Sequence, residues 1–302
     1  EWIRECLNCN KGCVDAIQGR RYISCVLNAE NGNEGTVFIK PAEKIKNIAV
    51  VGAGIAGLEA ARVAAKRGHH VTVYEKSDKI GGQIHLAAVP PRKSEILRAV
   101  TYYEKILPQL NVNIKLNTEA EAEELNQDDA VILAVGAHNM ALAMPVENSN
   151  VVSAWEVLAG KEVQGSCVVL GGGLVGTETA EYLEQKGGKV SIVEMMDKSA
   201  AGESSTVMPL KVKDFEKHEV AQYIQTKVVS IKNNVIEAVR TPDEAPVELK
   251  ADTIINALGS KKNIFDDAKL TVPFTYVGDC SGEKTADIAS AIRTGYHAAN
   301  EL

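Results

Sequence analysis

Long apolar runs, a secretory leader and an excess of basic charge are all absent from this sequence. No stretch approaches the roughly 20 apolar residues that a membrane helix needs, and the N-terminus lacks the pattern of a signal peptide. The 33 basic and 40 acidic residues give a net charge of −7, which favours neither nucleic acid nor an anionic membrane as a partner. We therefore expect a cytoplasmic protein that binds no nucleic acid and no membrane.

Two catalytic signatures are missing as well. No G-x-S-x-G accompanies Ser204 and Ser205, so hydrolase chemistry has no support. No C-x-x-C follows Gly57 or occurs in the second half of the chain, which excludes the redox-active disulfide of glutathione- or thioredoxin-reductase-like flavoproteins. If electrons leave a flavin for a site on this chain, the cysteines near the N-terminus are the candidates.

Four of the six cysteines lie within the first 25 residues. They belong to residues 1–46, here called the cysteine segment, which has scattered Asn and Gly and no sustained periodicity. Cys6, Cys9, Cys13 and Cys25 have the spacing C-x2-C-x3-C-x11-C, and in a reducing cytosol such a group is typical of metal binding. Three close ligands and one distant ligand favour a 4Fe–4S cluster, with tetrahedral zinc as the alternative.

From Asn47 onward a strand–turn–helix–strand pattern occurs twice. The first copy has apolar runs at 48–51 and 71–74, with a helix expected from about Leu58; the second has runs at 167–170 and 190–193, with a helix expected from about Thr177. Repeated βαβ units predict a duplicated nucleotide-binding architecture. The expected fold class is therefore α/β, with two Rossmann-like dinucleotide-binding domains of the FAD/NAD(P)-linked reductase type. We expect the first at 47–144 and 262–302, and the second inserted at 145–261.

Each copy contains a glycine fingerprint and a following acid. The first is Gly52-Ala-Gly54-Ile-Ala-Gly57 with Glu75 eighteen positions later, and the second is Gly171-Gly-Gly173-Leu-Val-Gly176 with Glu194 at the same offset. The three glycines permit a tight turn, close approach of a pyrophosphate and close helix–strand contact. The acid can accept hydrogen bonds from ribose hydroxyls. One G-x-G-x-x-G is weak evidence, but two in this context predict two dinucleotide sites.

The two copies differ in ways that separate flavin from nicotinamide. The first is followed by Lys76 and by Gly81-Gly82-Gln83, which suits an extended dinucleotide, and the pair Gly278-Asp279 precedes a helix near the C-terminus. Such an Asp can bind ribitol hydroxyls, and the helix N-terminus can stabilise negative charge on a flavin. In the second copy, Glu194 would repel a 2′-phosphate, which favours NADH over NADPH. His85, beside the glycine pair, could approach the flavin, but a lone His is more often structural or solvated, and that is the role expected for it.

The order of these motifs resembles a known family. CLNCNKGC…C, KNIAVVGAGIAGLEAA, YEKSDKIGGQIHLAAVPPRKSEI, the second fingerprint and YVGDC are similar, over essentially the whole chain, to the C-terminal portion of the iron–sulfur flavoenzymes related to 2,4-dienoyl-CoA reductase, 2-enoate reductase and trimethylamine dehydrogenase. In that family an FMN-carrying barrel with the substrate site precedes the cysteines. Because this sequence lacks such a region and begins with Glu, we expect a piece of a longer enzyme.

The resemblance implies an electron-input module. NADH would reduce FAD, FAD would reduce a 4Fe–4S cluster, and the cluster would feed the FMN of the absent barrel for reduction of an activated C=C bond. It implies Cys6, Cys9, Cys13 and Cys25 as cluster ligands. The residues expected at the FAD site are Gly52, Gly54, Ile55, Ala56, Gly57, Glu75, Lys76, Gly81, Gly82, Gln83, Gly136, Gly278, Asp279 and Ile288. Those expected at the NADH site are Gly171, Gly173, Leu174, Val175, Gly176 and Glu194.

No catalytic acid or base is assigned, because the family's substrate acid lies on the barrel. Some amine-dehydrogenase relatives hold only ADP at the first site, so an ADP-binding scaffold without NADH turnover is the alternative function. An electron-donor subunit similar to the small subunit of glutamate synthase is disfavoured, because that kind carries two clusters. The oligomeric state is left open, and a homo-oligomer is compatible with the sequence.

Overall fold

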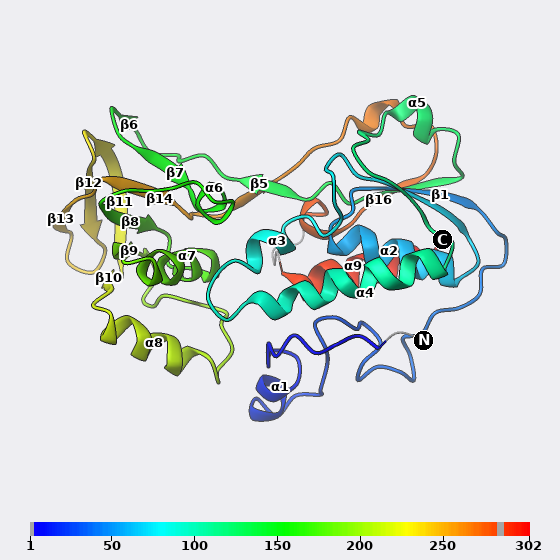
Figure 1. The fold of residues 1–302 in the computed structure, drawn as a ribbon, viewed down its shortest axis with the longest axis horizontal. Helices are drawn as coiled ribbons and strands as arrows, with labels where there is room; N and C mark the ends of the chain where they lie inside the picture. Colours follow the sequence, from blue (N-terminus) through cyan, green and yellow to red (C-terminus); the bar gives the residue numbers. More distant parts are fainter. Residues whose placement is uncertain (1–2, 283–286) are drawn as a thin grey trace. The chain divides into compact units, whose positions relative to one another are not determined.

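The computed structural model describes residues 3–282 and 287–302, and the chain divides into two compact units (Figure 1). Unit 1 contains Glu1–His85, Glu95–His138 and Lys262–Leu302, and unit 2 contains Leu86–Ser94 and Asn139–Lys261. Most of unit 2 is thus inserted between segments of unit 1. The predicted α/β class, with one Rossmann-like domain inserted in another, is confirmed. The sequence pattern had not separated Leu86–Ser94 from the first domain.

Unit 1 is built on a five-stranded parallel sheet with the order β16-β4-β1-β2-β3. Its strands are β1 (Asn47–Val51), β2 (His70–Tyr74), β3 (Asn113–Lys115), β4 (Ala130–Leu133) and β16 (Phe274–Tyr276). Successive side chains of a strand point to opposite faces, so Ile48 and Val50 enter one core while Ala49 and Val51 enter the other. Both faces of the sheet are therefore covered, as a parallel sheet requires.

Three helices pack on one face of this sheet: α2 (Ile55–Lys66), α4 (Arg98–Gln109) and α9 (Ile288–Asn300). Figure 1 shows α2 beside both α4 and α9. The approach of α9 to α2 depends on Gly295, where a Cβ would lie 2.2 Å from the carbonyl oxygen of Ala56. The shorter helical elements of the unit 1 segments and their junctions are α1 (Val14–Gln18), α3 (Ile84–Ala87), η1 (Ser94–Leu97), α5 (Ala122–Leu125), η2 (Asp267–Lys269) and η3 (Gly278–Cys280).

Unit 2 contains a second five-stranded parallel sheet, with the order β10-β9-β8-β14-β7, and a four-stranded sheet with the order β13-β12-β11-β6. The parallel strands are β7 (Val151–Ser153), β8 (Ser166–Leu170), β9 (Lys189–Val193), β10 (Ala221–Tyr223) and β14 (Thr253–Asn256). The other sheet has β6 (Val146–Glu147), β11 (Thr226–Lys232), β12 (Val235–Arg240) and β13 (Ala245–Lys250). The helices are α6 (Ala154–Leu158), α7 (Leu174–Gln185) and α8 (Met208–Lys217).

The chain passes between the units at β5 (Ala137–Asn139) and β15 (Ser260–Lys262), which pair as a two-stranded sheet. Within residues 3–282 and 287–302, none of the helices has the length and apolar character needed to cross a bilayer. Each unit thus has its own buried core, and each glycine fingerprint lies at the end of a central parallel strand.

Candidate nucleotide sites and the cysteine segment

The first glycine turn joins β1 to α2. Gly52 has φ +102°, and a Cβ there would lie 2.4 Å from the carbonyl oxygen of Ala134. A Cβ on Gly57 would lie 2.0 Å from the carbonyl oxygen of Gly52, so the first turn of α2 can pack on the strand only without a side chain. Nothing lies within 4 Å of a Cβ placed on Gly54. The turn is therefore closed at its first and third glycines and open at its second, as close approach of a pyrophosphate demands.

Helix α2 begins earlier than the sequence pattern indicated, at Ile55 and not near Leu58. Gly54 is its N-cap and offers no side-chain cap. The amides of Ile55, Ala56 and Gly57 therefore have no partner within the helix, and they lie at the positive end of its dipole. An uncapped helix start beside an open glycine is suited to binding a phosphate.

Glu75 lies at the end of β2 and is buried. Its Oε2 accepts a hydrogen bond of 2.7 Å from the amide of Ala53, and its Oε1 accepts bonds from the amide and hydroxyl of Ser77 at 2.9 and 2.6 Å. The carboxylate thus holds the glycine turn against the second strand, where the edge of a bound ribose is expected. Its contact with a ribose stays a prediction.

A second loop closes over the first turn. The amide of Gly81 donates to the carbonyl of Ala53 at 2.8 Å, and a Cβ on Gly82 would lie 3.2 Å from Cα of Gly54. Both Gly81 (φ +109°) and Gly82 (φ +51°) have left-handed backbones, which glycine adopts without strain. The predicted glycine pair is therefore placed directly against the open fingerprint glycine.

The third segment of unit 1 meets this loop at Asp279. Its Oδ2 accepts a hydrogen bond of 2.9 Å from Nε2 of Gln83. Burial raises the pKa of Asp279, and the Gln83 amide opposes that rise. A Cβ on Gly278 would lie 2.8 Å from Cβ of Ala56, so η3 is held close to the start of α2. The structure thus brings residues separated by more than 190 positions to one site.

The remaining residues predicted for this site have different surroundings. Lys76 is exposed, and a Cβ on Gly136 would lie 3.7 Å from Nε2 of Gln83. Ile288 starts α9, whose N-terminus is already capped, because Asp287 accepts from the amide of Ser290 at 2.7 Å. The start of α9 is thus less open than that of α2. His85 contacts the carbonyl of Ile80 at 2.7 Å, which is the structural role expected for it.

The second glycine turn, between β8 and α7, repeats the first. A Cβ on Gly171 would lie 2.6 Å from the carbonyl oxygen of Ala257, and one on Gly176 would lie 1.9 Å from that of Gly171, whereas nothing lies within 4 Å of one on Gly173. Glu194 accepts from the amide of Gly172 at 2.6 Å, as Glu75 does from Ala53. Helix α7 likewise begins directly after its uncapped glycine, at Leu174 followed by the exposed Val175, and not near Thr177.

The loops that close the two turns are related but not identical. Ala200 donates to the carbonyl of Gly172, in the position that Gly81 has in unit 1. Ala200 has φ +55°, and the side chain of Ser199 would lie 2.8 Å from a Cβ on Gly172. Side chains therefore occupy the part of the second site where the first has a glycine pair. The two sites therefore differ at the loop that closes over each glycine turn.

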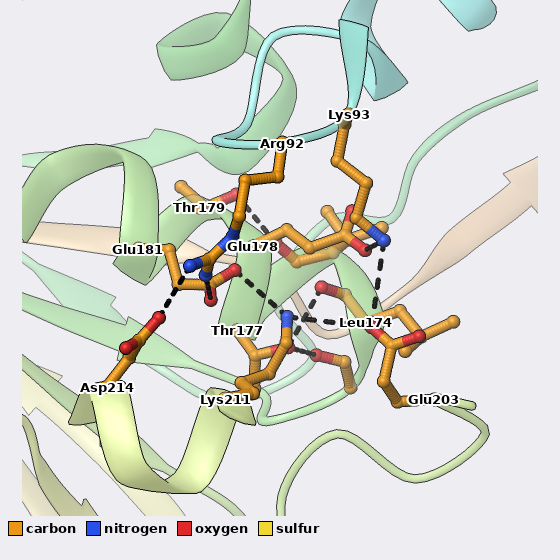
Figure 2. A network of polar contacts seen from close by, with 12 residues as sticks. Arg92, Lys93, Leu174, Thr177, Glu178, Thr179, Glu181, Glu203, Lys211 and Asp214 are labelled. Atoms are coloured by element: carbon orange, nitrogen blue, oxygen red, sulfur yellow. Dashed lines mark hydrogen bonds and ion pairs between the residues drawn. The ribbon is translucent and has the colours of Figure 1, made fainter. Parts of the chain in front are cut away.

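A network of charges that the sequence did not predict packs on α7 (Figure 2). Lys211 of α8 is buried and lies 3.0 Å from Oε2 of Glu181. Lys93 lies 2.8 Å from Oε1 of Glu178, and Arg92 bridges Glu181 and Asp214 at 3.1 and 2.7 Å. These pairs anchor the segment Leu86–Ser94 in unit 2. The sequence did contain one indication of this network, because Glu178 and Glu181 are three positions apart and so lie on one face of the helix. Such spacing, however, usually marks a solvated surface.

Tight backbone turns connect the first three cysteines of the cysteine segment, and amides of these turns point toward the sulfur atoms of Cys6 and Cys9. Asn8 and Asn10 have left-handed backbones, with φ of +55° and +59°. The amide of Asn8 lies 3.3 Å from Sγ of Cys6, and the amide of Lys11 donates to the sulfur of Cys9. Amide donors directed at sulfur stabilise thiolate ligands. The local turn chemistry therefore fits cysteines that act as ligands.

The distant Cys25 is brought to this loop by backbone pairing. The amide of Ser24 donates to the carbonyl of Gly12 at 2.7 Å, and a Cβ on Gly12 would lie 3.1 Å from Cα of Cys25. Burial raises the pKa of the Cys9 thiol, and the neighbouring thiols of Cys25, Cys13 and Cys6 raise it further. Within the described part of the chain, however, no three Cys, His, Asp or Glu side chains are arranged to hold a metal ion. Ligation by the four cysteines stays a prediction.

Each glycine turn, together with the following helix start and the acid that binds the turn, is here called a cradle: Gly52–Gly57 with Glu75 is the first, and Gly171–Gly176 with Glu194 is the second. These features define a class of protein with an α/β fold, two nucleotide cradles of the same design, and a cysteine segment joined to the unit of the first. The family described as pyridine nucleotide-disulphide oxidoreductase matches residues 46–276. The chain belongs to this family. The match supports FAD and a nicotinamide nucleotide as its cofactors, although no C-x-x-C like that of the disulfide-using members follows Gly57 or occurs in the second half of the chain.

Comparison with individual proteins confirms the resemblance drawn from the motifs. The chain is 46% identical over 309 residues to bilirubin reductase of Mediterraneibacter gnavus, which covers 99% of the chain and 47% of the relative. It is 35% identical over 308 residues to cinnamate reductase of Clostridium sporogenes, covering 99% and 46%. A solved complex of 2-naphthoyl-CoA reductase with 2-naphthoyl-CoA has a TM-score of 0.88 and 28% identity, covering 98% and 46%. The chain thus spans about half the length of these three relatives.

Proposed function

We propose that this chain is the NADH-oxidising portion of a larger flavin- and iron–sulfur-dependent reductase of activated C=C bonds. The first cradle would hold FAD, the second NADH and the four clustered cysteines a 4Fe–4S cluster. When bound, NADH would supply a hydride, FAD would act as the two-electron acceptor, and the cluster would act as a one-electron carrier. The electrons would leave for an FMN on a domain outside this chain.

The observation that carries the proposal is the duplicated cradle. In both units a central strand ends in a glycine turn that is open only at its second glycine, and an acid at the end of the neighbouring strand binds the middle of that turn. One such cradle is compatible with many nucleotide-binding proteins. Two in one chain, with a glycine pair packed against the first only, support two different dinucleotides used together.

The residues of the chain would bind and orient these groups. Open amides at the starts of α2 and α7 would neutralise the two pyrophosphates. Glu75 and Glu194 would accept hydrogen bonds from ribose, and Asp279, oriented by Gln83, would accept from the flavin ribitol. The chain would supply geometry, since no acid or base is required for hydride transfer between two bound cofactors.

The names of the relatives support the class of final substrate. Bilirubin, cinnamate and 2-naphthoyl-CoA, named for the three related reductases, all contain conjugated unsaturated bonds. We therefore expect an acceptor of the same kind, with its pocket outside this chain. About half of each of these three relatives lies beyond the region that this chain matches.

An anaerobic titration with NADH tests the proposal. The purified chain, reconstituted with FAD, should lose the absorbance of oxidised flavin on addition of one equivalent of NADH, and NADPH should be much less effective. Iron and acid-labile sulfide should be present together. A first site that holds ADP and a flavin spectrum that NADH does not change would instead identify a nucleotide-binding scaffold without turnover.

A further inference from the structure

Unit 1 contains a buried carboxylate that takes no part in the nucleotide cradle. Glu59 lies on α2 and is 0% exposed. It receives a bidentate pair of hydrogen bonds from Arg62, at 2.8 and 2.7 Å, and one from the hydroxyl of Tyr103 at 2.9 Å. Burial alone would raise the pKa of Glu59, but the charges of Arg62 and Arg4 outweigh it and hold that pKa below its usual value. Glu59 is therefore an ionised group inside the core.

Its remaining partner comes from the cysteine segment. Nη2 of Arg4 lies 3.1 Å from each carboxylate oxygen of Glu59, and Nη1 of Arg4 donates to the carbonyl of Leu27. The guanidinium also lies 5.0 Å from the ring centre of Tyr102. Arg4 precedes Cys6 by two residues and Leu27 follows Cys25 by two. One side chain thus joins both ends of the cysteine-bearing loop to α2.

Few apolar contacts are available to do the same. Leu7 and Leu27 are buried in the core around α2, and Cys9 and Val26 are partly buried against it, but Ile17 and Tyr22, between Cys13 and Cys25, are 60% and 96% exposed. In Figure 1 the cysteine segment runs alongside α4, in agreement with the 2.6 Å hydrogen bond from Nη1 of Arg98 to the carbonyl of Cys6. A segment with little apolar burial depends on its polar anchors for order. Hydrogen bonds to a guanidinium also fix direction, which apolar contacts do not.

We propose that Arg4 is a positioning residue, which through Glu59 and Leu27 fixes the four-cysteine loop against α2. Because α2 begins at the first cradle, a buried ion pair sets the separation between the thiols and the nucleotide site. The ordering of the loop is a property of the chain alone. Its consequence for a bound cluster rests on the proposed function.

Three variants of the 302-residue chain test this role. Arg4→Met removes the contacts with Glu59 and with the carbonyl of Leu27 but keeps an apolar side chain against Tyr102. Arg4→Lys keeps a positive charge beside Glu59 but loses the hydrogen bond to Leu27. Arg67→Met is the matched control, because Arg67 also binds two carbonyls, of Lys40 and Ala299 at 3.0 and 2.6 Å, away from the cysteines. Hydrogen exchange is measured in peptides covering 6–13, 22–28 and 47–51, together with iron and sulfide per chain.

Arg4→Met should exchange about ten- to a hundredfold faster in 6–13 and 22–28 and bind less iron, the factor expected for loss of charge-assisted hydrogen bonds. Exchange in 47–51 should be unchanged, which excludes general unfolding. Arg4→Lys should restore protection in 6–13 more than in 22–28, and Arg67→Met should resemble the wild type. Wild-type exchange in Arg4→Met would overturn the inference. A wild-type chain without iron, but with the predicted exchange, would support Arg4 as the anchor and contradict only the cluster in the proposed function.

Discussion

Substitution of the middle glycine of each fingerprint by alanine should remove one nucleotide from one site and leave the fold intact. The structure separates these glycines from their neighbours in sequence. A Cβ on Gly54 or Gly173 meets nothing within 4 Å, whereas a Cβ on Gly57 or Gly176 would lie 2.0 or 1.9 Å from a carbonyl oxygen. The backbone at Gly54, with φ −72° and ψ 175°, is one that alanine adopts freely.

The expected cost to folding is small. Alanine is a poorer N-cap than glycine by up to about 1 kcal/mol, and the lower entropy of the unfolded chain returns about 0.4–1 kcal/mol. The free energies of unfolding of Gly54→Ala and Gly173→Ala should therefore lie within about 1 kcal/mol of the wild type. Gly57→Ala should instead lose at least about 2 kcal/mol, because its methyl overlaps backbone that cannot move independently.

The expected cost to binding is larger. The added methyl occupies the space that a pyrophosphate needs, and overpacking of this kind costs about 1–3 kcal/mol, equivalent to roughly a 5- to 140-fold loss of affinity. Gly54→Ala should lose FAD, measured by flavin released from the purified protein and by titration of the apoprotein, and should keep its affinity for NADH. Gly173→Ala should retain FAD and lose NADH by a similar factor.

Binding of both FAD and NADH is measured in both variants, so that loss of one ligand can be assigned to one site. Gly57→Ala separates loss of a ligand from loss of the fold, and thermal unfolding of every variant identifies which has occurred. Wild-type affinity for FAD in Gly54→Ala would show that the open space above Gly54 is not a pyrophosphate site. Loss of FAD from Gly173→Ala with unchanged NADH binding would reverse the assignment of the two cradles.

Three further predictions concern stability and cofactor choice. Lys211→Met, which removes the cation 3.0 Å from the buried Glu181 and leaves Arg92 beside it, should lower the free energy of unfolding by about 1.5–3 kcal/mol in urea. Lys161→Met, at a pair on the surface, should change it by less than about 0.5 kcal/mol. Burial, then the charges of Arg67 and Lys46, lower the pKa of His69 from its usual 6.5, so the unfolded chain takes up the proton first and stability should fall as the pH drops below about 6.5. His69→Asn should flatten that slope in urea titrations, and an unchanged slope would place its origin elsewhere. Glu194→Ser should reduce the preference for NADH over NADPH, measured as the ratio of kcat/KM values, by about tenfold, and an unchanged ratio would contradict repulsion of the 2′-phosphate by Glu194.

Sequence alone was sufficient for the features that depend on neighbouring residues. The apolar runs, the glycine turns and the acids eighteen positions later identified both cradles, because a strand, a turn and the following helix are built from contiguous chain. The starts of α2 and α7 were predicted three residues too late. Apolar periodicity becomes visible only after the first turn of a helix, whereas hydrogen bonding begins directly after the N-cap glycine.

Tertiary structure decided which distant residues complete each site. Gln83 and Asp279 meet at 2.9 Å across 196 positions, and Arg4 reaches Glu59 across 55. Neither contact leaves a periodic signal, because each depends on how separate segments pack on the same helix. The same holds for Leu86–Ser94, which looks in sequence like a continuation of the first domain but is held in unit 2 by Lys93 and Arg92. Local chemistry therefore defined the two cradles, and long-range packing determined what surrounds them.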